Sequence, residues 1–180
     1  MKNAAGILVG EMIDVLVSTY NGSRFLAAQI DSILGQTHAD IRLMIRDDGS
    51  VDDTRAMLEE YASRDSRVAI VRDDLGNLGA RRSFMRLVDI SEAPCFMLAD
   101  QDDVWLPEKV AISFRKIVEM EREYGADTPL LAFTDLKIVD EHLNPVAGSM
   151  WQYQRLDPAI SGDWRDLLAQ NVVTGCTIIA

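Results

Sequence analysis

Short aliphatic runs alternate with segments of helical periodicity along most of the chain, and this alternation limits the fold more than any other feature. Apolar residues recur at helical spacing after Ser23, which we expect to cap its helix, and again after Asp52, Gly79 and Pro107. The runs are bounded by turn residues, as strands are. We predict strands at 13–18, 41–46, 68–71, 95–99 and 130–133, with 136–139 as a further candidate. Continuous apolar strands separated by helices predict a mostly parallel sheet covered on both faces.

The composition agrees with one α/β domain over residues 1–180. Of 180 residues, 48% are hydrophobic and 26% are charged, which is enough apolar material for a core. The net charge of −11, without a block of Lys or Arg, disfavours nucleic acid as a partner. Cys95 and Cys176 lie among small or apolar residues, so we expect two buried, reduced thiols in a reducing compartment. We find no stretch of the length and apolarity that a membrane span needs.

Three loops at the carboxyl ends of the predicted strands are rich in polar residues. They are 18–21 after the first strand, 47–50 after the second and 100–103 after the fourth. Ligands of open α/β sheets bind beyond the carboxyl ends of the strands. Asp and Gly are also ordinary turn residues, so each loop alone has a structural explanation. Their occurrence at one sheet edge predicts a binding site there.

The loop at 100–103 has the chemistry of a divalent metal site. Asp100 and Asp102, separated by one residue, present carboxylate oxygens of the kind that Mg²⁺ or Mn²⁺ binds. Such an ion would hold a diphosphate and neutralise its charge as it departs. Asp103 is either a further ligand or a residue that orients the loop and caps the next helix. A D-x-D pattern is common, so it does not decide the function by itself.

Nucleotide recognition in this chain must rely on side chains. The first strand is not followed by G-x-G-x-x-G, and G-x-x-x-x-G-K-[ST] does not occur, which excludes Rossmann and P-loop phosphate sites. Tyr20 is placed to pack against a base. Asp48 is a candidate acceptor for the N3–H group of uracil or thymine. The expected ligand is therefore a uridine or thymidine nucleotide.

Several motifs, in this order and spacing, resemble the signatures of family 2 glycosyltransferases of the GT-A fold. The motifs are VSTYNG at 17–22, RDDGSVDDT at 46–54, GNLG at 76–79 and MLADQDDVWLPEK at 97–109. Two later segments, IVDEHLNPVAGSMW at 138–151 and LLAQNVVTGCT at 167–177, are similar to the bacterial rhamnosyltransferase-like branch that builds cell-surface polysaccharides. The resemblance extends over nearly the whole chain from Ile13 onward.

The resemblance implies a GT-A fold, with a mostly parallel central sheet flanked by helices and truncated at its C-terminal side. It also implies two sets of site residues and Mg²⁺ or Mn²⁺ as the cofactor. The implied nucleotide-binding residues are Ser18, Tyr20, Asn21, Asp48, Asn77 and Arg81, with Arg82 as an alternative to Arg81 for a phosphate contact. The implied metal ligands are Asp100, Asp102 and Asp103.

The activity that the resemblance implies is inverting, metal-dependent sugar transfer. The expected donor is a dTDP- or UDP-sugar, in particular dTDP-rhamnose, and the expected acceptor is a glycan or a lipid-linked glycan. The expected location is the cytoplasm, including the inner face of the membrane. Inversion requires a base on the acceptor hydroxyl. The resemblance places that base beyond Ala180, with Asp135 as a candidate within the chain, so we expect donor binding without efficient transfer.

Two alternatives belong to other functional classes. FMLADQDDV also fits the D-x-D-x-[TV] motif of haloacid-dehalogenase-like phosphohydrolases, with Asp100 as nucleophile and Asp102 as acid and base. That interpretation needs the acidic pair Asp140 and Glu141 at the metal, and it leaves the motifs of the first half without a role. The other alternative is a nucleotide-sugar-binding domain without catalysis.

Overall fold

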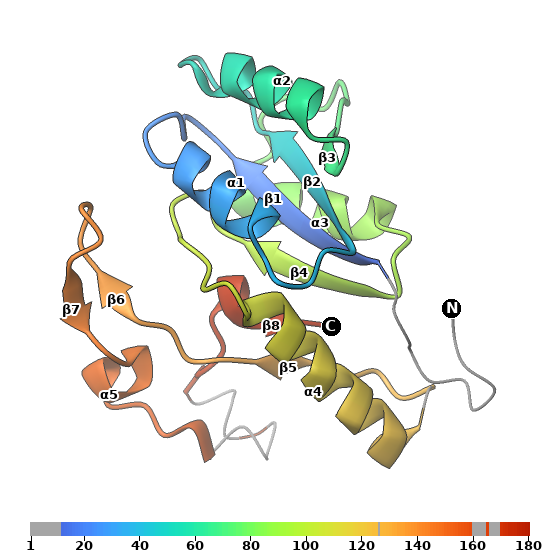
Figure 1. Ribbon diagram of the computed structural model, residues 1–180, viewed down its shortest axis with the longest axis vertical. Helices are drawn as coiled ribbons and strands as arrows, with labels where there is room; N and C mark the ends of the chain where they lie inside the picture. Colours follow the sequence, from blue (N-terminus) through green and yellow to red (C-terminus); the bar gives the residue numbers. More distant parts are fainter. Residues whose placement is uncertain (1–11, 126, 160–164, 166–169) are drawn as a thin grey trace.

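A six-stranded sheet forms the centre of the molecule in the computed structural model, which describes residues 12–125, 127–159, 165 and 170–180 (Figure 1). The strand order is β3-β2-β1-β4-β8-β5. The strands are β1 (Ile13–Thr19), β2 (Ile41–Asp47), β3 (Val68–Ile70), β4 (Cys95–Ala99), β5 (Ala132–Phe133) and β8 (Ile178–Ile179). Pairs β1–β2, β1–β4 and β2–β3 are parallel, while β8 runs antiparallel to β4 and β5. The predicted mostly parallel sheet is confirmed.

Helices cover both faces of this sheet, as the unbroken apolar strands predict. They are α1 (Leu26–Leu34), α2 (Thr54–Arg64), α3 (Ala80–Ile90) and α4 (Lys109–Tyr124), while the short α5 (Met150–Gln154) lies near β6 (Ile138–Val139) and β7 (Pro145–Ala147) (Figure 1). Alternate residues of β1 point to opposite faces. Val15 and Val17 pack in the larger core with α1, α2 and α4, whereas Leu16 packs with Leu87 of α3 on the other face. In the described part of the chain, no helix is long and apolar enough to cross a bilayer.

Two local predictions need correction. Ser23 is not the N-cap of α1, because that helix begins at Leu26 and the backbone N–H of Ser23 donates to Asp52 in the loop before α2, at 3.1 Å. The segment 136–139 does not join the central sheet. Only its last two residues form a strand, β6 (Ile138–Val139), which pairs with β7 (Pro145–Ala147) in a separate hairpin.

A partly buried ion pair links the first two strands to the end of α3. Asp14 is fully buried on β1, and both of its carboxylate oxygens accept hydrogen bonds from Arg42 of β2, at 2.8 and 2.7 Å. The Ser91 hydroxyl, just after α3, donates to the same carboxylate at 2.6 Å. These contacts tie β1 to β2 and to the end of α3, and the parallel pairing of β1 with β4 brings the carboxyl ends of both strands to one side (the left-hand side of Figure 1).

Candidate functional site

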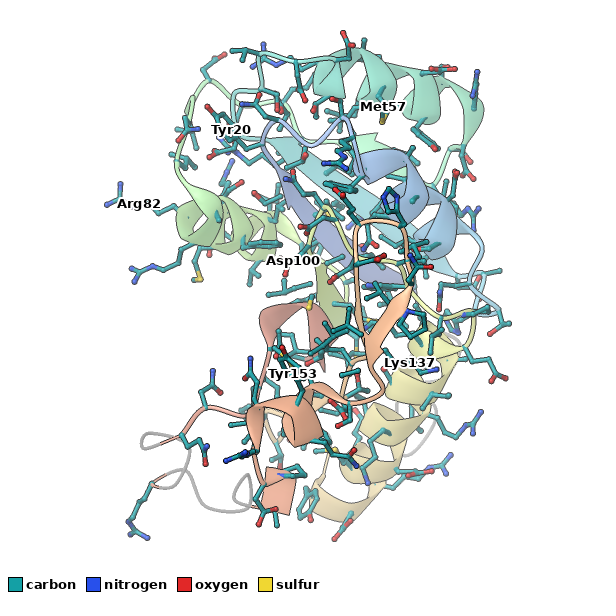
Figure 2. All side chains as sticks on the ribbon, turned by 90° about the vertical axis from the view of Figure 1, so that its left-hand side faces the viewer. Tyr20, Met57, Arg82, Asp100, Lys137 and Tyr153 are labelled. Atoms are coloured by element: carbon teal, nitrogen blue, oxygen red, sulfur yellow. The ribbon has the colours of Figure 1, made fainter. Side chains whose placement is uncertain are left out.

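The loop after β1 and the acidic loop after β4 meet through Gln101. The Gln101 Oε1 atom accepts hydrogen bonds from the Thr19 hydroxyl at 2.7 Å and from the Tyr20 backbone N–H at 2.9 Å. Its Nε2 atom donates to the Tyr20 carbonyl at 3.4 Å. Tyr20 remains 49% exposed, on the same face of the molecule as Asp100 (Figure 2). Two of the three predicted loops are therefore joined at one edge of the sheet.

The loop after β2 joins the same edge through Asn21. This residue has a φ of +49°, its N–H donates to the Ser50 hydroxyl at 2.8 Å, and its Oδ1 accepts from the Val51 N–H at 2.9 Å. The backbone N–H of Asp48 donates to the Thr19 carbonyl at 2.8 Å. Asn21 thus holds two loops together, while Ser18 lies half-buried at the end of β1.

Asp48 is 2% exposed and lies across the start of α3. Its Oδ1 accepts from the Leu78 N–H and its Oδ2 from the Gly79 N–H, each at 2.8 Å. Arg46 donates a further hydrogen bond to Oδ1. The Asn77 side chain donates to the Asp48 carbonyl at 2.8 Å. The GNLG motif is therefore a loop held by Asp48, in which one oxygen of the carboxylate carries two hydrogen bonds and the other carries one.

Arg81 and Arg82 follow this loop in the first turn of α3. Both are exposed, and within the described residues neither side chain has a hydrogen bond or an ion pair. Figure 2 shows Arg82 directed away from the body of the molecule. These guanidinium groups are free to meet a ligand, in contrast to the buried side chains beside them.

Arg46 is one of the residues at this edge whose role our sequence analysis missed. It is 1% exposed, and besides Asp48 it donates to both carboxylate oxygens of Asp73, to the Gly76 carbonyl and to the Ser83 hydroxyl, at distances between 2.8 and 3.1 Å. Hydrogen bonds from Arg46 hold the pKa of Asp73 below its usual value. An Arg at the carboxyl end of an apolar strand, followed by Asp47 and Asp48, was the available signal, because a buried guanidinium requires carboxylate partners.

The metal-type cluster at the end of β4 differs from the predicted set. A carboxylate oxygen of Asp100, one of Asp103 and the Cys176 sulfur all lie within 4.8 Å of one another. Gln101 and Asp102 form a turn that brings Asp103 back toward Asp100, and Asp102 is exposed beside them. The thiol was expected only as a buried core residue. It reaches the cluster from the 3₁₀ helix Gly175–Thr177, which precedes β8.

The electrostatics of this cluster fit a divalent cation. Burial raises the pKa of Asp100, and the nearby Asp103 and Asp102 carboxylates raise it further. Burial also raises the pKa of Asp103 and, together with Asp103, that of the Cys176 thiol. Lys109 supplies one positive charge, but its Nζ donates to the Cys176 carbonyl at 3.0 Å. Converging carboxylates that resist ionisation are the arrangement that a bound Mg²⁺ or Mn²⁺ relieves.

The Asp135 carboxylate binds backbone N–H groups at the start of α5. Its Oδ1 accepts from the backbone N–H groups of Leu136, Met150 and Trp151, at 2.8, 3.1 and 3.3 Å. Burial raises the pKa of Asp135, but hydrogen bonds from Ser149 and from these amides outweigh it, so the net pKa is lowered. A general base works best with a pKa near the working pH. This environment makes Asp135 a weaker base than an ordinary aspartate.

The acidic pair that a phosphohydrolase would need lies in the β6–β7 hairpin. Asp140 accepts hydrogen bonds from the Asn144 side chain and from the N–H groups of His142 and Asn144 in the hairpin turn. Glu141 forms an ion pair with Arg24, in the loop before α1. Within the described residues, neither acid belongs to the cluster formed by Asp100, Asp103 and Cys176.

Comparison with known proteins gives concordant results. Residues 14–133 match the family model described as glycosyl transferase family 2. An uncharacterized glycosyltransferase of Nostoc sp. is 36% identical over 110 residues, which are 60% of this chain and 32% of that protein. A dTDP-rhamnosyl transferase of Shigella flexneri is 32% identical over 98 residues, which are 52% of this chain and 34% of that protein. The chain spans about a third to a half of the length of such curated relatives.

Solved structures show the same architecture. A mannosyltransferase from Pyrobaculum calidifontis, in complex with GDP-Man and Mn²⁺, superposes with a TM-score of 0.50 at 18% sequence identity. The match covers 55% of this chain and 30% of the other. At that identity the likeness concerns the fold, and it confirms the predicted GT-A architecture.

Proposed function

Because the chain belongs to glycosyl transferase family 2, we propose that it binds the nucleoside diphosphate of a sugar donor and takes part in sugar transfer to an acceptor hydroxyl. One observation carries this proposal: the Asp100–Asp103 cluster and the exposed Tyr20 lie on two loops that Gln101 joins. A metal-dependent donor site needs these two elements, a cation site and a surface for the base, at a fixed separation.

The metal ligands are proposed to be Asp100 and Asp103, with the exposed Asp102 beside them. A bound Mg²⁺ or Mn²⁺ would supply positive charge to the departing diphosphate. Two facts support this assignment: burial and mutual repulsion raise the pKa of Asp100, and the related fold from Pyrobaculum calidifontis was solved with Mn²⁺. Lys109 holds the Cys176 carbonyl and so keeps the C-terminal segment against the acidic loop.

The nucleotide is proposed to be a pyrimidine nucleotide that lies along the loops after β1 and β2. Tyr20 offers its exposed ring to the base, and the Oδ2 atom of Asp48 retains a lone pair for an N3–H group. Arg81, free on the first turn of α3, is proposed to contact a phosphate. Ser18, half-buried at the end of β1, is proposed to contact the nucleotide, whereas the Asn21 and Asn77 side chains bind neighbouring loops and contribute through the shape of those loops.

The proposed donor is dTDP-rhamnose, and the proposed acceptor is a glycan, free or lipid-linked, in cell-surface polysaccharide synthesis at the cytoplasmic side. The 32% identity to a protein named dTDP-rhamnosyl transferase supports the donor. Inversion at the sugar requires a base on the acceptor hydroxyl. Asp135 is a weak candidate for that base because its pKa is lowered by the amides that it caps.

The test is release of dTDP from dTDP-rhamnose, with Mn²⁺ and a glycan acceptor, by the wild-type protein and by Asp100→Asn. We expect slow, metal-dependent release, because Asp135 is a weak base, and a further fall by about a hundredfold or more in the variant, the size of effect seen when charge stabilisation of a leaving group is removed. Equal release by the two proteins would overturn the assignment of the site. Metal-dependent hydrolysis of p-nitrophenyl phosphate, without dTDP release, would instead favour the phosphohydrolase.

A further inference from the structure

Gln101 lies between two aspartates of the acidic loop, but its side chain leaves that loop. The carboxamide reaches the end of β1, where it binds one side-chain group and two backbone groups. Its oxygen accepts from the Thr19 hydroxyl and the Tyr20 N–H, and its nitrogen donates to the Tyr20 carbonyl. Gln101 therefore engages both backbone hydrogen-bonding groups of Tyr20, as a neighbouring strand would.

These contacts need a carboxamide of this length. A glutamate would keep the two acceptor contacts at Thr19 and Tyr20, but it has no donor for the Tyr20 carbonyl. A methionine has nearly the same shape and neither polar atom. Comparing glutamine, glutamate and methionine at position 101 therefore distinguishes the effect of the hydrogen bonds from the effect of the volume of the side chain.

The absence of a side chain at Gly22 makes room for the Gln101 carboxamide. A Cβ atom at Gly22 would lie 2.5 Å from the Gln101 Oε1 and 2.7 Å from the Thr19 hydroxyl oxygen, which is closer than van der Waals contact permits. The obstructing atom of Gln101 is the far end of a flexible side chain. An alanine at this position should therefore push the carboxamide away from Tyr20, and its Cβ atom also crowds the Thr19 hydroxyl at the end of β1.

We propose that Gln101 is a positioning residue for the donor nucleotide. It fixes the backbone of Tyr20, and with it the ring that faces the base, relative to the metal-binding aspartates on either side of Gln101. This inference rests on the proposed function of the site. When the Tyr20 loop and the metal-binding loop are already fixed relative to each other, the donor loses less binding free energy to the ordering of these loops.

The experiment separates base binding from metal binding. Calorimetry with UDP and with dTDP, in chelator, reports the nucleotide half, and Mn²⁺ titration by electron paramagnetic resonance, without nucleotide, reports the metal half. We expect Gln101→Met and Gly22→Ala to weaken UDP and dTDP by about tenfold, the size expected for loss of one or two hydrogen bonds, with Mn²⁺ affinity within about twofold of wild type. Gln101→Glu, which keeps the acceptor contacts, should recover most of the nucleotide affinity in chelator.

Asp102→Asn is the matched control, because it changes the next residue of the same loop without touching Tyr20. It should weaken Mn²⁺ and leave nucleotide affinity in chelator unchanged. Unchanged nucleotide affinity in Gln101→Met, or equal losses of nucleotide and Mn²⁺, would overturn the inference. Failure of the wild-type protein to bind either nucleotide would instead refute the proposed function. Thermal melting of each variant confirms that binding is measured on folded protein.

Discussion

The guanidinium of Arg46 spans both carboxylate oxygens of Asp73, with its Nε and Nη2 atoms at 3.1 and 3.0 Å. Both side chains are largely buried, and Asp73 draws the loop after β3 against the sheet. Asp73→Asn should lower the free energy of unfolding at pH 7 by about 2 kcal/mol, the usual worth of hydrogen bonds to a charged group. Urea denaturation of the two proteins measures this difference.

The same pair predicts the pH dependence of stability. Because folding lowers the pKa of Asp73, its contribution is fully present above the ordinary carboxyl pKa of about 4 and is lost as the pH falls through the lower pKa of the folded state. The stability difference between wild type and Asp73→Asn should therefore shrink at acidic pH. A difference that stays constant down to the acid unfolding transition would contradict the ion pair.

Asp48 should matter for stability as well as for binding. Asp48→Ala removes the acceptors of the Leu78 and Gly79 amides and one partner of Arg46, so we expect a loss on the order of 3 kcal/mol, as for other broken buried ion pairs. If Asp48 also contacts the base, UDP affinity should fall far more than pyrophosphate affinity when both are measured on folded protein by calorimetry. Equal weakening of the two ligands would show that Asp48 acts only by holding the loop.

The position of the binding-site loops at one edge of the sheet was predictable, because hydrophobic periodicity and turn residues are local features of the sequence. The strand that ends at Thr19 and the strand that ends at Ala99 were both found from their apolar runs, and parallel packing brings their ends together. The loops that follow, with Tyr20 and Asp100, were therefore expected to converge. Their side-chain contacts were not predictable, because the Gln101 carboxamide binds backbone groups of a distant loop, which no pattern of residue types encodes.

Cys176 illustrates a second limit. It reaches the acidic cluster because β8 pairs antiparallel with β4, with reciprocal backbone hydrogen bonds between Phe96 and Ala180. Such long-range pairing cannot be read from the periodicity of a two-residue strand. The sequence context of Cys176 correctly indicated a buried free thiol. It did not indicate that Asp100 and Asp103 lie beside it.

The thiol predicts how the site selects among metals. Soft thiolate ligands favour Cd²⁺ or Zn²⁺, whereas carboxylates favour Mg²⁺. Cys176→Ser should lower the affinity for Cd²⁺ by about tenfold or more and leave the affinity for Mg²⁺ within about twofold. The reason is that Cd²⁺ binds a thiolate much better than a hydroxyl, whereas Mg²⁺ depends on the carboxylates. Thiolate-to-cadmium absorbance in the ultraviolet and thermal shift measure the two affinities. Unchanged Cd²⁺ binding in the variant would place the thiol outside the site.

The linkage between nucleotide and metal tests the donor site most directly. The measurement is the melting temperature with UDP, dTDP or GDP, each in Mn²⁺ and in chelator. A ligand that binds only the folded state adds about 2.7 kcal/mol of stability at a hundred times its dissociation constant. We expect UDP and dTDP to raise the melting temperature much more in Mn²⁺ than in chelator, and Asp100→Asn to remove that difference. Equal stabilisation with and without Mn²⁺, or none by either pyrimidine nucleotide, would contradict the account.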